Sequence, residues 1–294
     1  MLVTLKEILD LCEAKKCAAG AFNTPNLESL MGVLSAAEEL DVPVIIQHAQ
    51  VHEELVPLDI IGPIMVDMAK KASVPVAVHL DHGESLPYLQ RALNMGFTSV
   101  MYDGSTLSYE ENVANTRLAV SMARRTGASV EAELGCMGKR ENGSGSAGEG
   151  VDPDKIYTDP DQAKLFVEAT GIDALACSFG TTHGVYLSQP QLDFGVVEKV
   201  REKALVPVVM HGGSGVSEED FRQAIRKGVR KINYYTYMAM AGGESAASHL
   251  AGSCDLAASE GKGGAPIMYH DIVRWGMEAM KENCKKAMEV FSMR

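Results

Sequence analysis

The chain has 294 residues and a mass of 31.5 kDa, enough for one large domain or two small ones. Its hydrophobic fraction of 46% and charged fraction of 22% are typical of a soluble globular protein, which excludes disordered, collagen-like and coiled-coil chains. Lysine and arginine total 27 against 39 aspartates and glutamates, so the formal charge is −12, and neither nucleic acid nor an anionic membrane is an expected partner.

The first residues and the cysteines bear on the compartment. Residues 1–17 predict an amphipathic helix with interleaved acidic side chains rather than a signal peptide. No window approaches the roughly 20 apolar residues that span a bilayer. The six cysteines are scattered and form no CxxC pair, so neither a disulfide framework nor a thiolate zinc site is expected. These features predict a cytoplasmic protein with reduced cysteines that serve in packing.

Short apolar or β-branched runs alternate with helical segments along the chain. Eight runs predict strands, at residues 17–22, 42–47, 74–80, 99–102, 129–134, 174–178, 206–210 and 231–234. Three of these runs have a proline near the start and then a nearly continuous apolar stretch, as expected for strands buried on both faces. Between the strands, apolar residues recur at helical spacing in residues 27–40, 86–94, 109–125, 162–169, 194–203 and 218–227.

Eight strand–helix units in about 250 residues are what a (β/α)8 barrel requires, so we predict an α/β protein with the TIM-barrel fold. A doubly wound open sheet is the alternative, but no GxGxxG motif follows the first predicted strand. No internal domain boundary is evident. We therefore expect a single domain over residues 1–294, with the barrel in about 1–240 and a C-terminal loop and helix in about 241–294.

Two segments fall outside the strand–helix pattern. Residues 251–266 resemble a loop, and residues 267–293 predict a terminal helix whose apolar face would pack on the barrel or on another subunit. Residues 138–150 read GKRENGSGSAGEG and follow the fifth predicted strand. Because barrel enzymes carry their sites on that face, this segment is either a mobile active-site loop or a plain solvated connection.

Polar and ionisable residues follow the predicted strands, and in a barrel these positions share one rim. His82, His183 and His211 follow the third, sixth and seventh strands. One such histidine alone is more often structural, but three imidazoles on one rim are typical of a catalytic zinc site with a vacant position. The remaining histidines are expected to be structural or surface residues: His48, His52, His79, His249 and His270.

Three carboxylates accompany the histidines. Asp81 directly precedes His82 and could either orient an imidazole or exchange a proton with the substrate. Asp103 and Glu133, at the next two strand ends, could form a second cation site or only satisfy nearby basic groups. Spacing alone leaves both choices open.

A glycine-rich turn, HGGSG at residues 211–215, precedes a helix that is predicted to begin near Ser217. The exposed N–H groups of such a turn can bind an anion at the helix N-terminus. The turn lies in the seventh βα loop, with Asn233 and Thr236 after the eighth strand, which matches the usual phosphate site of TIM barrels. The sequence therefore predicts a phosphorylated substrate.

Seven motifs in this order resemble the class II, metal-dependent ketose-bisphosphate aldolases, the family of fructose-bisphosphate and tagatose-bisphosphate aldolases. The motifs are GAFNTPNLE (20–28), VHLDHG (78–83), MYDGSTLSYEENV (101–113), VEAELGCMG (130–138), FGTTHGVY (179–186), HGGSG (211–215) and KINYYT (231–236). The resemblance implies a TIM barrel that forms a homodimer or larger assembly. It also implies reversible aldol cleavage of a ketose bisphosphate, such as fructose 1,6-bisphosphate, into dihydroxyacetone phosphate and glyceraldehyde 3-phosphate.

The resemblance also implies a role for each residue of the site. His82, His183 and His211 would hold one catalytic zinc ion, Asp81 would be the proton donor, and Asp103 with Glu133 would form an alternative metal position. Glu141 matches the loop glutamate that acts as a base, although the run around it is altered. A monovalent cation, Na⁺ or K⁺, would lie near the phosphate. The implied substrate-binding residues are Asn23, Gly184, Gly212, Gly213, Ser214, Asn233 and Thr236.

Three positions depart from the family pattern. Ala49, Leu187 and Tyr237 each replace a residue that is commonly more polar or charged near the pocket. These departures keep two other functions open: an aldolase for another phosphorylated ketose of the tagatose type, or a non-catalytic zinc-dependent sugar-phosphate binder. A further alternative keeps the barrel and the metal but is a sugar-phosphate isomerase or epimerase.

Overall fold

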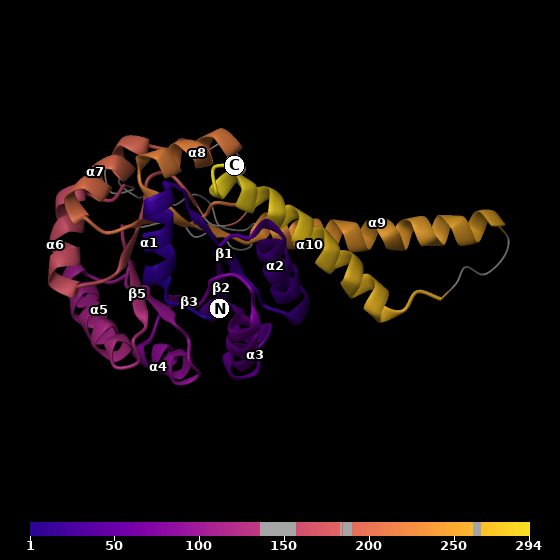
Figure 1. The fold of residues 1–294 in the computed structure, drawn as a ribbon, viewed down its shortest axis with the longest axis horizontal. Helices are drawn as coiled ribbons and strands as arrows, with labels where there is room; N and C mark the ends of the chain where they lie inside the picture. The colour runs from indigo at the N-terminus through magenta and orange to yellow at the C-terminus, as the bar shows by residue number, and fades with distance from the viewer. Residues whose placement is uncertain (136–156, 183, 185–189, 261–265) are drawn as a thin grey trace.

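The computed structural model describes residues 1–135, 157–182, 184, 190–260 and 266–294. Within these ranges, parallel strands close into a barrel in sequence order (Figure 1). The predicted TIM barrel is thereby confirmed. The strands are β1 (Ala19–Asn23), β2 (Val44–Ala49), β3 (Val76–Gly83), β4 (Ser99–Tyr102), β5 (Ser129–Leu134), β6 (Ala174–Cys177), β7 (Val208–Met210) and β8 (Val229–Tyr234).

Helices surround the barrel, and α8 begins after Ser217, as its sequence predicts. The Ser217 hydroxyl accepts a hydrogen bond from the backbone N–H of Asp220. Three acidic residues lie in the first turn of α8, where their negative charges interact favourably with the positive end of the helix dipole. The outer helices are α2 (Leu27–Leu40), α3 (Leu58–Lys71), α4 (Leu86–Asn94), α5 (Tyr109–Arg124), α6 (Pro160–Thr170), α7 (Phe194–Ala204) and α8 (Glu218–Lys227), with a short 3₁₀ helix η1 (Gln50–Glu54) after β2.

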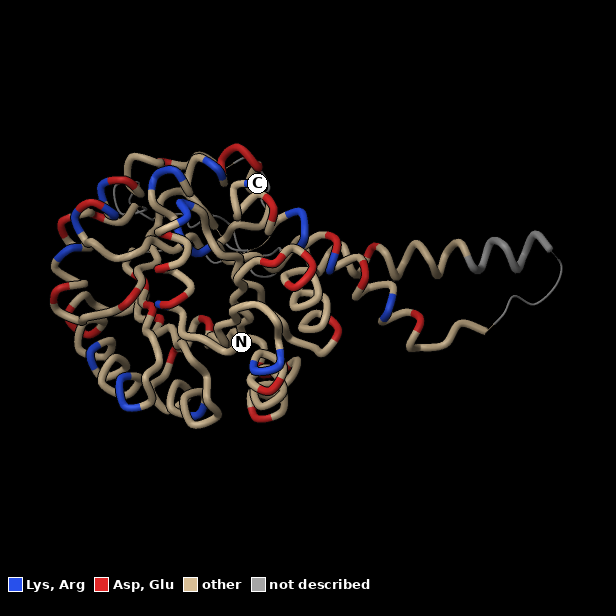
Figure 2. Tube along the Cα trace, viewed as in Figure 1, with Lys and Arg blue, Asp and Glu red and all other residues tan. Residues whose placement is uncertain are grey.

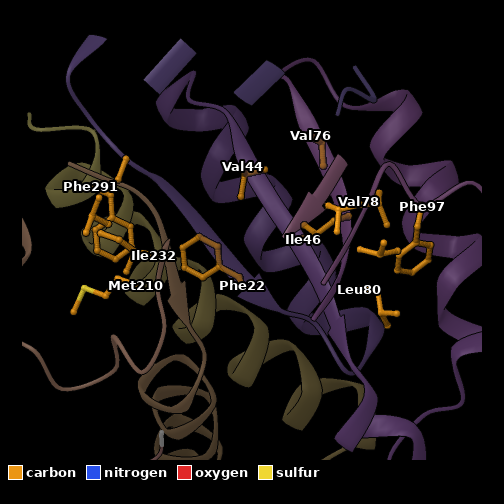
Figure 3. Packing of buried hydrophobic residues seen from close by; sticks show 14 of the residues in the cluster. Phe22, Val44, Ile46, Val76, Val78, Leu80, Phe97, Met210, Ile232 and Phe291 are labelled. Atoms are coloured by element: carbon orange, nitrogen blue, oxygen red, sulfur yellow. The ribbon is translucent and has the colours of Figure 1, made fainter. Parts of the chain in front are cut away.

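Alternate residues of each strand face opposite sides of the barrel wall. Phe22, Ile46 and Val78 pack outward in the layer between strands and helices (Figure 3). The residues beside them in sequence, such as Ala21 and Ala77, belong to a separate apolar group inside the barrel, which includes side chains of helix α1 (Leu5–Lys15). The wall is therefore apolar on its outer face, whereas the polarity of its inner face can change along the barrel axis.

Helix α1 closes the end of the barrel where the strands begin. Its Leu5, Ile8 and Leu9 side chains are fully buried against the barrel interior, and burial of each contributes roughly 1.5–3 kcal/mol. The amphipathic helix predicted for residues 1–17 is confirmed with slightly narrower bounds. With this end sealed by apolar contacts, polar side chains in the interior are confined to the opposite end.

The C-terminal region differs from the sequence prediction. Residues 251–260, which resembled a loop, belong to a continuous helix, α9 (Thr236–Glu260). Alanines recur along this segment and favour a helix despite Gly252. Helix α9 also packs along α10 (Tyr269–Phe291), which confirms the predicted terminal helix. The two helices cross closely at Gly242 and Gly276, where a Cβ on Gly276 would lie 3.5 Å from the Gly242 carbonyl oxygen.

Together α9 and α10 project away from the barrel as an arm (Figure 1). The last turn of α10 returns to the barrel, where the Phe291 ring packs 4.9 Å from the Phe221 ring. Charged residues of both signs are interspersed over the outer helices, whereas much of α9 carries none (Figure 2). Among the described helices, none is both long enough and apolar enough to cross a membrane.

Strand boundaries shift by a few residues from those predicted. Residues 17 and 18 precede β1, because the Cys17 N–H bonds back to the Cys12 carbonyl at the end of α1. Strand β3 runs on to Gly83, three residues beyond the predicted end. The four cysteines whose side chains are described are buried free thiols, as predicted: Cys12, Cys17, Cys177 and Cys284.

Candidate functional site

Ionisable side chains gather inside the barrel at the carboxyl ends of the strands. Strand β3 ends in Asp81 and His82, β5 carries Glu133, and His211 directly follows β7. Parallel strands that close in sequence order bring these positions onto one rim. The rim predicted from the sequence is therefore present for the described strands.

The closest grouping joins Asp81, His82 and His211. One potential ligand atom from each lies within 4.8 Å of the others, and His211 Nδ1 is 3.0 Å from His82 Nε2. Imidazole nitrogens and carboxylate oxygens are the donors that bind zinc and similar divalent metals. This donor set fits a divalent metal ion.

A second grouping shares His82 and adds Asp103 and Glu133. His82 Nδ1 lies 2.8 Å from Asp103 Oδ2, and Ser105 donates to the other oxygen of that carboxylate from both its N–H and its hydroxyl. Burial opposes a charge on His82, but the carboxylates of Asp81 and Asp103 outweigh it and raise the His82 pKa to about 10. His82 also has a φ of 44°, an uncommon conformation for a residue other than glycine.

Glu133 faces both groupings. Its Oε2 lies 3.7 Å from His211 Nδ1 and has no hydrogen-bond partner within the described part of the chain. Burial, with the nearby charge of Asp103, raises the pKa of Glu133 to about 8. A buried carboxylate oxygen aimed at this cluster is a further feature that fits a cation.

Three side-chain amides hold the Asp81 carboxylate. Asn23 donates to Oδ2 at 3.0 Å, Gln47 donates to the same oxygen at 3.2 Å, and Asn233 donates to Oδ1 at 3.1 Å. Burial disfavours the charged form, but His82 and other nearby cations outweigh burial and hold the pKa of Asp81 well below its usual range. Asp81 is thus an oriented, ionised carboxylate beside the imidazoles.

The glycine-rich turn after β7 lies against the end of β8 and the residue that follows it. The Gly213 N–H donates to the Asn233 carbonyl, and the Ser214 hydroxyl accepts from the Tyr235 N–H. Gly212 has a φ of 64°, and a Cβ there would lie 2.3 Å from the Thr182 carbonyl oxygen, so only glycine fits. The turn and Thr236, which opens α9, lie at adjacent strand ends, as predicted.

Some predicted positions are described in part or not at all. His183, Leu187, Glu141 and the segment 138–150 lie outside the described residues. Gly184 is described and has a φ of 90°.

The sequence analysis assigned no role to Gln47, Glu131 or Lys231. Glu131 Oε1 lies 2.8 Å from His211 Nε2, and Lys231 Nζ lies 2.8 Å from Glu131 Oε2. Burial opposes ionisation of Glu131, but the charge of Lys231 lowers the pKa of Glu131 to about 2. The signal was present in the sequence, because Glu131 and Lys231 stand two positions before Glu133 and Asn233 and so share their inward face.

A parallel barrel with imidazoles and carboxylates gathered at one rim defines a metal-binding barrel enzyme. The chain matches the family model described as fructose-bisphosphate aldolase class-II over residues 3–294. The chain therefore belongs to the class II fructose-bisphosphate aldolase family and is a metal-dependent lyase.

Individual relatives agree with this assignment. The chain is 41% identical over 240 residues to a fructose-bisphosphate aldolase of Geobacillus stearothermophilus, covering 80% of this chain and 81% of the relative. It is 39% identical over 241 residues to the D-tagatose-1,6-bisphosphate aldolase subunit GatY of Klebsiella oxytoca, covering 82% and 83%. The crystal structure of the YdjI aldolase from Escherichia coli K12 superposes with a TM-score of 0.84 at 36% identity, covering 99% of this chain and 97% of that one.

Proposed function

We propose that this aldolase uses zinc to cleave a ketose bisphosphate reversibly into dihydroxyacetone phosphate and an aldehyde. Fructose 1,6-bisphosphate, which would give glyceraldehyde 3-phosphate, is the first candidate, because the Geobacillus relative bears that name. The observation that carries the proposal is the clustering of Asp81, His82 and His211 on one rim with the glycine-rich turn. Tagatose 1,6-bisphosphate is the second candidate, supported by the GatY relative.

His82 Nε2 and His211 Nδ1 face each other and would both bind the zinc ion. His183 would be the third ligand, on the strength of the family resemblance. Asp103 and Glu133 would form the alternative metal position, since one potential ligand atom of each lies within 4.8 Å of one from His82. When bound, one zinc ion per chain would polarise the ketose carbonyl and stabilise the negative charge that develops as the carbon–carbon bond breaks.

Asp81 would carry the proton at the C4 hydroxyl. As an ionised carboxylate held by three amides, it would accept that proton during cleavage and return it to the aldehyde during condensation. Glu141 would exchange the proton at the carbon next to the carbonyl, a role that rests on the family resemblance.

The turn formed by Gly212, Gly213 and Ser214 would bind the phosphate of dihydroxyacetone phosphate, with Ser214 donating from its N–H and its hydroxyl, because the Gly213 N–H already donates to the Asn233 carbonyl. A monovalent cation, Na⁺ or K⁺, would accompany this phosphate. The remaining substrate contacts would come from Asn23, Gly184, Asn233 and Thr236.

The test couples zinc-loaded protein to a dihydroxyacetone phosphate assay with the two bisphosphates in parallel, with and without a chelator. Chelator-sensitive release identifies the aldolase and its sugar. Asp81→Asn should lower kcat by about 10²–10⁴ with zinc still bound, whereas Asp67→Asn, an exposed carboxylate paired with Lys71, should have no effect. Zinc and phosphate binding without turnover on either sugar would instead favour the non-catalytic binder.

We also propose a homodimer or larger assembly that acts in the cytoplasm. Met268 and Tyr269, at the start of α10 on the projecting arm, are 52% and 78% exposed, which favours burial against another copy. The buried free thiols are those expected in a reducing compartment. Light scattering of the purified protein and cell fractionation would test the two statements, and a monomer or an exported protein would refute them.

A further inference from the structure

Directly below the rim, the barrel holds a second set of polar side chains, which we call the interior cluster: His79, Ser99, Glu131 and Lys231. All four are fully buried. Lys231 Nζ lies 2.8 Å from Glu131 Oε2, and His79 Nε2 lies 3.7 Å from the same oxygen. His79 Nδ1 in turn lies 2.7 Å from Ser99 Oγ. The cluster joins strands β3, β4, β5 and β8 across the barrel.

The fold does not require charges at this level. TIM-barrel interiors are usually filled by branched apolar side chains, and the next layer of this barrel is apolar, with Ala21, Ile45 and Ala77 fully buried. Removing a carboxylate and an ammonium from water costs more than their attraction returns unless the geometry is favourable. Packing alone therefore does not explain the buried ion pair of Glu131 and Lys231, which points to a functional role.

The contact between Glu131 and His211 supplies that role. Glu131 Oε1 lies 2.8 Å from His211 Nε2, while the other ring nitrogen, Nδ1, lies 3.0 Å from His82 Nε2. In a neutral imidazole one nitrogen carries the proton and the other carries the lone pair. Because a carboxylate only accepts hydrogen bonds, Glu131 places the His211 proton on Nε2 and leaves the Nδ1 lone pair facing His82.

We propose that Glu131 and Lys231 are positioning residues for His211: Glu131 fixes the tautomer and the ring angle of this imidazole, and Lys231 holds Glu131 in place from the opposite side. This inference rests on the proposed metal site. Neither residue reaches the rim, so neither would contact substrate; both act through the side chain of His211.

The test uses Glu131→Gln, Lys231→Met and the double variant that combines them. Glutamine has nearly the shape of glutamate but can donate as well as accept, so it no longer dictates the tautomer. The matched control is Glu198→Gln with Lys227→Met, which removes an ion pair of 2.9 Å from the protein surface.

Three measurements are made on each protein: the His211 tautomer by ¹⁵N NMR of histidine-labelled, metal-free protein, the zinc affinity by competition with a chromophoric chelator, and the Tm of the metal-free protein. We expect the wild type to carry the Nε2–H tautomer. Glu131→Gln should show a mixture of tautomers and bind zinc about 10- to 100-fold more weakly. The control variant should change neither the His211 tautomer nor the zinc affinity.

The double variant separates positioning from charge compensation. Lys231→Met leaves the Glu131 carboxylate buried without its cation, so Tm and zinc affinity should both fall. Neutralising Glu131 as well should restore much of the Tm, yet zinc affinity should stay low because the carboxylate is absent.

Two results would overturn the inference. One is a Glu131→Gln protein with the wild-type tautomer and the wild-type zinc affinity. The other is a double variant that recovers zinc affinity together with Tm, which would make the pair purely structural. A wild-type chain that binds no zinc would refute the proposed function instead, and the tautomer comparison would still decide whether Glu131 orients His211.

Discussion

Gly212 offers a sharp test of the turn that we assign to phosphate binding. It has a φ of 64°, and an alanine Cβ would lie 2.3 Å from the Thr182 carbonyl oxygen and 2.7 Å from the Thr182 carbonyl carbon. Both atoms belong to the backbone that follows β6, so the turn or that loop must move. Gly127 is the matched control, because its φ is 76° and a Cβ there meets nothing within 4 Å.

The two substitutions share the backbone strain and differ in the clash. A residue with a Cβ pays about 1–2 kcal/mol in the left-handed region, partly offset by about 0.4–1 kcal/mol from the stiffer unfolded chain. Gly127→Ala should therefore cost between about 0 and 1.6 kcal/mol. Gly212→Ala should cost about 1–3 kcal/mol more, the usual penalty of overpacking.

Thermal unfolding of the metal-free protein measures this difference. At roughly 2–4 °C per kcal/mol for a domain of this size, Gly212→Ala should melt about 2–12 °C below Gly127→Ala. Calorimetric titration with inorganic phosphate should show binding to Gly127→Ala and a loss of at least about 10-fold in Gly212→Ala, equivalent to 1.4 kcal/mol. Equal Tm values and equal phosphate affinities for the two variants would refute the reasoning.

Other predictions concern His48 and the arm. Burial lowers the pKa of His48 to about 4, so the unfolded chain binds a proton that the folded chain lacks between about pH 6.5 and 4, and the free energy of unfolding should fall by up to about 3 kcal/mol across this window. Urea unfolding at a series of pH values should show a smaller fall in the free energy of unfolding for His48→Gln than for the wild type. The control His270→Gln, at an exposed position, should show the wild-type pH dependence. If His48→Gln also kept the wild-type pH dependence, burial of His48 would not be the cause of the fall. In α9, a Cβ on Gly242 would lie 2.9 Å from Met280 Cγ, whereas one on Gly243 meets nothing within 4 Å. Gly243→Ala should therefore raise the stability by about 0.5–1 kcal/mol and raise Tm, while an equal gain for Gly242→Ala would show that α9 and α10 do not pack closely there.

Helix α9 shows where pattern reasoning failed. The four glycines in residues 251–266 suggested a loop, because each glycine lowers helix stability when it is considered alone, yet only Gly252 lies in residues 251–260. In the structure this segment continues a helix whose earlier part packs along α10, an element that follows it in the chain. Local propensity could not reveal the packing that stabilises the first half of α9.

The interior cluster shows a different limit. Alternation along β5 and β8 places Glu131 and Lys231 on the same face as Glu133 and Asn233, and this much could be read from the sequence. That Glu131 contacts both Lys231 and His211 depends on how far each strand is staggered along the barrel axis. The stagger is set by barrel closure, which no single strand encodes.

The sequence by itself determined the barrel and its rim. Buried parallel strands require apolar runs, and each parallel crossover requires a helix, so the alternating pattern specified the fold. Parallel strands all end on the same face, which specified that His82, Asp103, Glu133 and His211 would meet there. Only the tertiary structure decided the distances between them, the three amides that hold Asp81, and the buried ion pair below His211. Those contacts join residues far apart in the chain, and they arise only when the closed barrel sets the strand registers and fills its interior.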